Sequence, residues 1–282
     1  MKVGNERHNM FKNLSIQSIS REAVIMTAGL MLAAGCAGRN ADKNRAAGPA
    51  GANDLYARGD KAYQAGDQDA AIRDLEAAVA ANPKMLMARE RLGDAYKDAG
   101  RYQDAMAEYR ELARLDPYGP SSYYKLGVTQ QLLGQLPEAA ENYQRALKLD
   151  PREWRSRMNL GLVRLAQGNT DEAVKSTKMA TDAAPNQADA WSNYGVTLDA
   201  AGKPADAEQA YRKALSLRPK QPGTMVNLAQ SLVAQKKYDE AAALLAEVVQ
   251  IEDGAFARRL YGDVLKAQGK TAEAEAQYEK GK

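Results

Sequence analysis

Residues 188–221 read ADAWSNYGVTLDAAGKPADAEQAYRKALSLRPKQ, and this stretch decides the fold because most of the chain repeats its pattern. A glycine equivalent to Gly195 returns at five spacings of 34 residues and one of 33, with an alanine once in its place. A series of alanines keeps the same spacings. The two series are Gly59, Gly93, Gly127, Gly161, Gly195, Ala229 and Gly262, and Ala71, Ala105, Ala139, Ala173, Ala207, Ala241 and Ala274. A fixed period of about 20 to 50 residues indicates a repeat architecture.

Each period contains the signals of two helices. In its first half, apolar residues recur at spacings of three and four, which places them on one face of a helix. A glycine such as Gly202 then ends this helix, and a second amphipathic run ends at a proline such as Pro219. The small residues, Gly195 on the first helix and Ala207 on the second, are expected to let the backbones approach closely. Tyrosines that recur at one place of the second helix are interpreted as core, namely Tyr109, Tyr143, Tyr211 and Tyr278.

The pattern resembles a tetratricopeptide repeat array from Ala52 to Lys282, with repeats starting near 52, 86, 120, 154, 188, 222 and 255. The family's signature places hold Trp191, Tyr194, Gly195, Ala207, Tyr211, Ala214 and Pro219 in the fifth repeat, and Leu92, Gly93, Tyr96, Ala105, Tyr109 and Pro117 in the second. The resemblance implies an all-α fold, a right-handed superhelix (α-solenoid) of about seven helix-turn-helix repeats. The sixth repeat departs from the pattern, with Ala229, Lys236 and Asp253 where Gly, Gly and Pro are usual.

Residues 1–35 have the features of a signal peptide. Four basic residues precede an apolar run at residues 23–34, which is too short for the roughly 20 residues that a spanning helix needs. The run ends in Leu32-Ala33-Ala34-Gly35-Cys36, which resembles a bacterial lipobox, although the leucine usually lies three residues before the cysteine and here lies four before. The resemblance implies acylation of Cys36, with palmitate among the chains. An ordinary secretory leader or an uncleaved anchor is the alternative.

The next segment predicts how the folded part is held. Residues 36–52 contain no large apolar side chain and are interpreted as a flexible tether that begins at the lipidated Cys36. Residues 53–282 then form the repeat superhelix. By resemblance to the sorting rule of such lipoproteins, Ala37 after the cysteine points to the outer membrane, with the protein facing the periplasm. The expected membrane contact is therefore through the lipid anchor.

Composition argues against several kinds of site. The only histidine is His8 and the only cysteine is Cys36, so residues 37–282 offer no ligands or base for a zinc site, an iron–sulfur cluster or a His-dependent catalytic triad. Without residues 1–35 the net charge falls from +3 to +1, which gives no reason to expect nucleic-acid binding. Adjacent carboxylates, Asp171 with Glu172 and Asp239 with Glu240, lie at expected helix starts, where the helix dipole explains them. We expect no enzyme activity, cofactor or metal.

The resemblance implies that the first helices line the inner wall of the superhelix, where a protein or peptide partner would bind. Places 2, 5, 9 and 12 of each repeat share one helix face, and in repeats three to six they carry many apolar residues. Asparagines at place 6 of three successive repeats could hold a peptide backbone. The predicted groove residues are Tyr124, Val128, Met158, Asn159, Leu162, Leu165, Asn193, Val196, Val226 and Asn227. Self-packing of this wall, and packing roles for the asparagines, stay open as alternatives.

Among lipidated repeat proteins, the chain most resembles the tight-adherence (Flp) pilus assembly lipoprotein. The similarity lies in residues 194–202 and 227–232, where much of the match is repeat consensus. It implies a scaffold in assembly of a pilus or secretion apparatus. Two other functions remain open: a pilotin-like lipoprotein of a type IV pilus secretin, and an adaptor that regulates peptidoglycan enzymes.

Overall fold

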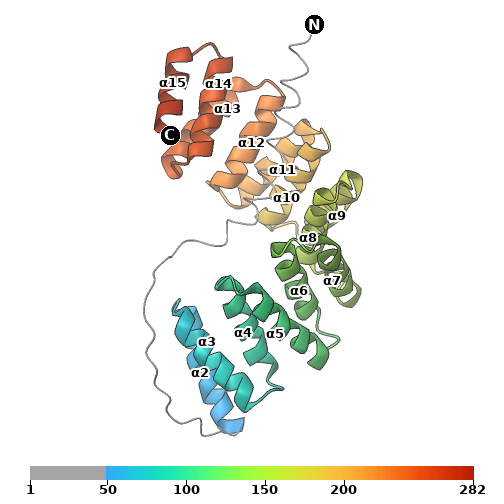
Figure 1. Ribbon diagram of the computed structural model, residues 1–282. Coiled ribbons are helices and arrows are strands. Elements are labelled where there is room, and N and C mark those ends of the chain that lie inside the picture. The colour runs from blue at the N-terminus through green and yellow to red at the C-terminus, as the bar shows by residue number, and fades with distance from the viewer. Residues whose placement is uncertain (1–48) are drawn as a thin grey trace. The chain divides into compact units, whose positions relative to one another are not determined.

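The computed structural model describes residues 49–282, in which the chain forms fourteen α-helices and no β-strand (Figure 1). The expected signal peptide, Cys36 and the tether up to residue 48 lie outside the described residues. The helices are α2 (Pro49–Gln64), α3 (Gln68–Ala81), α4 (Leu86–Asp98), α5 (Tyr102–Leu115), α6 (Pro120–Leu132), α7 (Leu136–Leu149), α8 (Trp154–Ala166), α9 (Thr170–Ala183), α10 (Ala188–Ala200), α11 (Pro204–Leu217), α12 (Pro222–Ala234), α13 (Tyr238–Ile251), α14 (Ala255–Ala267) and α15 (Thr271–Lys280).

The helix starts agree closely with the sequence period. The six first helices from α4 to α14 begin at residues 86, 120, 154, 188, 222 and 255, which are the predicted repeat starts. The exception is α2, which begins at Pro49, whereas the sequence predicts a tether up to residue 52. A proline suits the first turn of a helix because its missing N–H would have no partner there. No helix within residues 49–282 is both long and apolar enough to cross a bilayer.

The chain divides into two compact units after Pro151, so that α2–α7 belong to the first unit and α8–α15 to the second. In each unit the two helices of a repeat pack against each other, and the second helix also packs against the first helix of the next repeat. The first helices contact one another as well, α2 with α4 and α8 with α10. The expected all-α architecture of tandem helix pairs is therefore confirmed within each unit.

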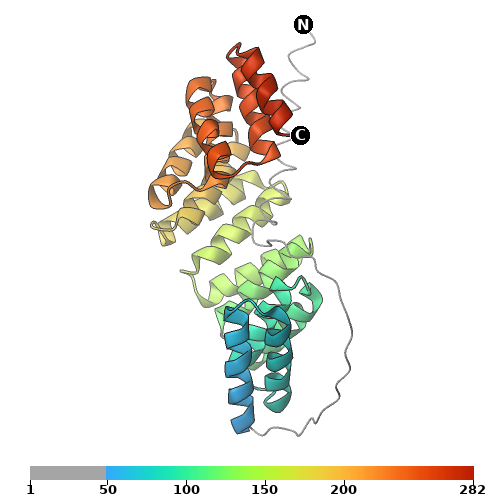
Figure 2. The same ribbon diagram turned by 90° about the vertical axis from the view of Figure 1, so that its left-hand side faces the viewer.

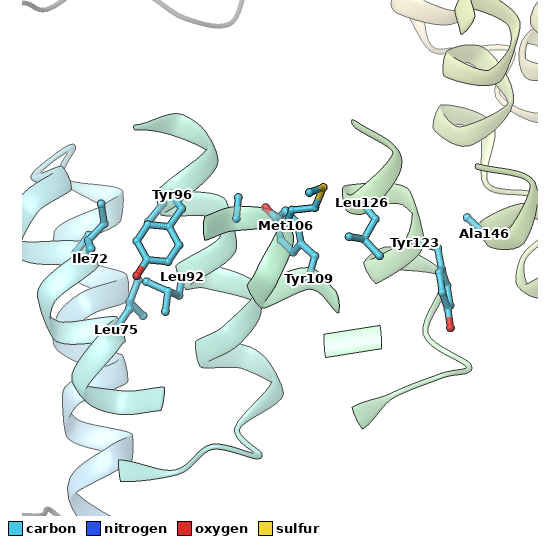
Figure 3. Close-up of a cluster of buried hydrophobic side chains, with 12 residues drawn as sticks. Ile72, Leu75, Leu92, Tyr96, Met106, Tyr109, Tyr123, Leu126 and Ala146 are labelled. Atoms are coloured by element: carbon cyan, nitrogen blue, oxygen red, sulfur yellow. The ribbon is translucent and has the colours of Figure 1, made fainter. Parts of the chain in front are cut away.

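Buried side chains from successive helices form the core of the first unit. Figure 3 shows Leu92 and Tyr96 of α4 beside Ile72 and Leu75 of α3. The whole cluster consists of Ala71, Ile72, Leu75, Leu92, Ala95, Tyr96, Ala105, Met106, Tyr109, Tyr123, Leu126 and Ala146. Each repeat thus completes the core of its neighbour, as expected for helix pairs that cannot bury their apolar faces alone.

Glycines on the first helices leave room for side chains of the second helices, whereas the sequence predicts a close approach of the backbones. In the third repeat, a Cβ added to Gly127 would lie 2.7 Å from Cε1 of Tyr143, whose ring is fully buried. Tyr109 and Tyr211, at the same place of their repeats, are also buried, which confirms that they belong to the core. Tyr278 in the last repeat is only half-buried.

The turn between the two helices of a repeat needs a left-handed residue. Glycine supplies it in six repeats, with φ between 70° and 83°. In the sixth repeat Lys236 takes this place with φ of 62°. The following helix α13 begins at Tyr238, 34 residues after the start of α11, so the turn keeps its shape without a glycine. A residue with a Cβ is strained in this region of conformational space.

Replacing Lys236 by glycine is therefore expected to raise the free energy of unfolding by about 1 kcal/mol. The reverse change, Gly202→Lys, places a Cβ at φ of 70° and should lower the free energy of unfolding by a similar amount. Chemical denaturation of both variants and the parent protein measures the two effects. Equal stability of Lys236→Gly and the parent would contradict the strain at this turn.

Candidate functional site

The predicted groove residues all lie on first helices, as the repeat period predicts. Tyr124 and Val128 belong to α6 of the first unit, and the other eight belong to α8, α10 and α12 of the second. Nine of the ten side chains are half-buried, and Val196 is buried with 8% exposure. Tyr124 packs partly against the core cluster of the first unit, and Val226 packs against Met225, Val248, Val249 and Ala257. These contacts favour the self-packing alternative for Tyr124 and Val226, and a groove role of the other predicted residues stays a prediction.

Asn193 has partners within the second unit. Its Nδ2 donates to the backbone oxygen of Asp189 at 2.8 Å and to Sδ of Met158 at 3.2 Å. These contacts tie α10 to α8. The structure therefore supports a packing role for Asn193, while a peptide-binding role of Asn159 and Asn227 stays a prediction.

A pocket of about 290 Å³ lies on the first helices of the first unit, outside the predicted apolar wall. It is lined by Tyr56, Met87, Glu90, Arg91, Asp94 and Lys125, from α2, α4 and α6. Met87 is 58% exposed, which is unusual for a large apolar side chain. The sequence indicates a polar mixture on the inner wall of the first two repeats, where Tyr56, Glu90 and Asp94 lie. The spacing rule could have found Met87, which occupies place 2 of its repeat.

Three ion pairs cross between the helices of this pocket. Nζ of Lys125 lies 2.5 Å and 2.7 Å from the two carboxylate oxygens of Asp94, and 3.3 Å from Oε1 of Glu90. Nε of Arg91 lies 2.5 Å from Oδ1 of Asp60, in ion-pair contact but without hydrogen-bond alignment, and neither atom has a hydrogen bond within residues 49–282. Since each pair joins neighbouring first helices, the charges fix the shape of the pocket.

Glu90 is the most accessible charge among these pairs. Its side chain is 40% exposed, compared with 19% for Lys125 and 15% for Asp94. It accepts a hydrogen bond from Oγ of Ser121 at 3.0 Å, so its position is defined although part of it faces solvent. Glu90 therefore offers carboxylate oxygens to a partner beside the exposed Met87.

The buried tyrosines of the second helices donate hydrogen bonds to polar groups on the first helix of the same repeat. The hydroxyl of Tyr109 donates to Oδ1 of Asp94 at 2.7 Å, and the hydroxyl of Tyr143 donates to Oε1 of Gln131 at 2.9 Å. Burial, together with the nearby Asp94, raises the pKa of Tyr109 far above its usual value. Tyr109 thus stays protonated and anchors the carboxylate that also binds Lys125 in the pocket.

Asp199 plays a similar part in the second unit, where it joins three helices. From α10 it accepts hydrogen bonds from Oγ of Ser231 on α12 at 2.5 Å and from the hydroxyl of Tyr211 on α11 at 3.0 Å. Burial raises the pKa of Asp199 to about 6, although these two hydrogen bonds oppose the shift. The carboxylate links the fifth repeat to the sixth.

The adjacent carboxylates lie where the sequence places them. Asp171 and Glu172 are in the first turn of α9, and Asp239 and Glu240 are in the first turn of α13; all four are exposed. Negative charge near a helix N-terminus is stabilising. This position accounts for both pairs without a catalytic role.

Comparisons with known proteins agree with the helix-pair architecture. Family models described as tetratricopeptide repeat match residues 56–120, 124–188 and 167–222, and others of the same description match residues 200–258 and 255–280. No match was found among curated protein sequences.

Solved structures of repeat proteins are also similar to the chain. A structure of MamA is 27% identical, with a TM-score of 0.52, and the match covers 60% of this chain and 92% of that one. PilF of Pseudomonas aeruginosa is 24% identical, with a TM-score of 0.61 and coverage of 68% and 88%. PilW, a type IV pilus biogenesis factor, is 19% identical, with a TM-score of 0.65 and coverage of 71% and 92%. Since one family model matches more than half of its residues, the chain belongs to the tetratricopeptide repeat family.

Proposed function

We propose that this protein-interaction scaffold is an outer-membrane lipoprotein that faces the periplasm and acts in assembly of a tight-adherence (Flp) pilus or secretion apparatus. Membership of the tetratricopeptide repeat family supports a role in binding proteins. The lipobox-like residues Leu32 to Cys36 support the anchor. The likeness to PilF, and to PilW as a type IV pilus biogenesis factor, supports a pilus-related role by analogy, since it is a likeness of fold.

The pocket on α2, α4 and α6 carries this proposal, because it combines an open space with partly exposed groups of two kinds. Met87 and Tyr56 offer apolar surface, and Glu90 offers hydrogen-bond acceptors. An extended peptide can place an apolar side chain on the first two and a basic side chain or backbone N–H at the third. The ion pair of Lys125 with Asp94 holds the walls in place before binding, which reduces the entropy cost of association.

The substitution Glu90→Arg is expected to lower recovery of the partner at least about tenfold. The arginine repels a basic group of the peptide, and it cannot accept the hydrogen bond that the carboxylate of Glu90 accepts. The matched control is Glu111→Arg. Glu111 is 43% exposed, close to the 40% of Glu90, but lies on the second helix α5 and pairs with Arg114. Affinity purification of each variant from native membranes, followed by mass spectrometry, measures recovery.

The control should recover partners at the parent level. Undiminished recovery with Glu90→Arg, at an unchanged helical signal in circular dichroism, would contradict a binding role for the pocket. The identity of the recovered proteins distinguishes the assembly system. Flp pilus components support the proposal, a type IV pilus secretin supports the alternative to which the PilW likeness points, and a cell-wall hydrolase or synthase supports the adaptor alternative.

A further inference from the structure

Exposed large apolar side chains gather at one edge of the first unit. Leu86, Met87 and Tyr118 are 38%, 58% and 82% exposed, and among the described residues they are the only large hydrophobic side chains of this unit that are exposed to this degree. All three lie at the turns that lead from the second helix of one repeat to the first helix of the next: Leu86 and Met87 begin α4, and Tyr118 lies just before α6. We call these three residues the turn edge.

The chain enters the first unit at this same edge. Since each short turn reverses the chain, the first helices α2, α4 and α6 run parallel and begin at one end of the unit. Figure 2 shows α2 beginning at the lower end of the first unit. Pro49, the first residue of α2, follows Cys36 by thirteen residues. Thirteen peptide units span at most about 45 Å when fully extended, so an anchor at Cys36 keeps this edge close to the lipid.

Resting on the lipid anchor of the proposed function, we propose that the turn edge lies against the phospholipid surface to which the anchor is attached. Leu86 and Met87 place apolar groups at the edge, and the side chain of Tyr118 combines an apolar ring with a hydroxyl, a combination suited to the membrane–water interface. The exposed Lys84, two residues before Leu86, can meet lipid phosphates. Tyr118 lies on the turn before α6 and Leu86 is the first residue of α4, and neither lines the peptide pocket, whereas Met87 also lines the pocket and lies at the border of the two surfaces.

The anchor makes so small a contact sufficient. Three partly inserted side chains bind a membrane weakly by themselves, so a protein without the lipid anchor would dissociate quickly from the membrane. Attachment through Cys36 raises the effective concentration of the edge at the surface, so that a weak second contact becomes populated without new affinity. The contact would fix the orientation of the first unit relative to the leaflet.

Site-specific labelling of the full-length lipoprotein tests the contact. Acylated Cys36 leaves an engineered cysteine as the only free thiol, because the chain has no other cysteine. An environment-sensitive fluorophore is placed at Tyr118→Cys, and at Gln103→Cys as the matched control, since Gln103 is exposed near the start of α5 at the opposite end of the helices. Both proteins are reconstituted into phosphatidylethanolamine and phosphatidylglycerol vesicles with and without brominated chains.

The label at position 118 should be quenched at least about threefold more by brominated lipid than the label at position 103. Equal quenching of the two labels, with acylation confirmed by mass spectrometry, overturns the contact and leaves the anchor intact. A fluorescence change of the label at position 118 that occurs only in native membranes, where other proteins are present, also overturns the lipid contact and assigns the edge to a protein partner. A mass that shows an unacylated Cys36 overturns the proposed anchor and this inference together.

Discussion

Replacing Gly127 by alanine is expected to lower the free energy of unfolding by about 2 kcal/mol. The added Cβ would lie 2.7 Å, 2.8 Å and 3.0 Å from three ring atoms of Tyr143. The ring cannot move away cheaply, because Tyr143 is fully buried and its hydroxyl donates to Gln131. Alanine favours a helix over glycine by about 1 kcal/mol, so the clash must exceed this gain for the net loss to appear. Chemical denaturation followed by circular dichroism measures the change.

The sixth repeat supplies the matched control. It carries Ala229 in place of the glycine and Leu245 in place of the tyrosine, and both are fully buried. In a Tyr143→Leu background, the change Gly127→Ala should therefore cost nothing, or even stabilise through helix propensity. If alanine costs the same about 2 kcal/mol in both backgrounds, the ring contact is not the reason for the glycine.

The sequence could predict this contact because it repeats. Glycine at place 8 and tyrosine at place 24 occur together in the second, third, fifth and seventh repeats, and in each of these four the glycine faces the tyrosine ring. The same regularity explains why six first helices begin at the predicted residues. The start of α2 differs, because the repeat pattern does not include the Pro49 that begins the helix.

The candidate site could be predicted only in part, for a physical reason. The period places a residue on the inner wall, but its exposure depends on the side chains of the neighbouring repeat. Val226 packs in part against Ala257 of the next repeat and Val196 is buried, whereas Met87 on the same predicted wall stays exposed. The partners of Lys125 and Asp199 lie about one repeat away, at separations of 31 and 32 residues. Each of these pairs occurs at one interface between two repeats, and the consensus pattern of the repeat does not contain it.

Asp199 is expected to make the stability of the second unit depend on pH. Its pKa rises from an ordinary value of 3.8 to about 6 in the folded protein, mainly through burial. The folded state therefore holds a proton that the unfolded chain has already released between these values. The stabilisation is complete below about pH 4 and is lost as the pH rises through 6. A shift of this size corresponds to about 3 kcal/mol.

The variant Asp199→Asn isolates this effect, because its amide does not titrate but can still accept one hydrogen bond. The difference in the free energy of unfolding, parent minus variant, should fall by about 3 kcal/mol between pH 3 and pH 7.5. Other carboxylates cancel in the difference. One is Glu208, where hydrogen bonds from Lys237, Gln235 and Arg212 outweigh burial and lower the pKa to about 2, so its own contribution runs in the opposite direction. Parallel pH profiles of parent and variant would show that Asp199 titrates alike in the folded and unfolded chains, and the link between the fifth and sixth repeats would then be independent of its charge.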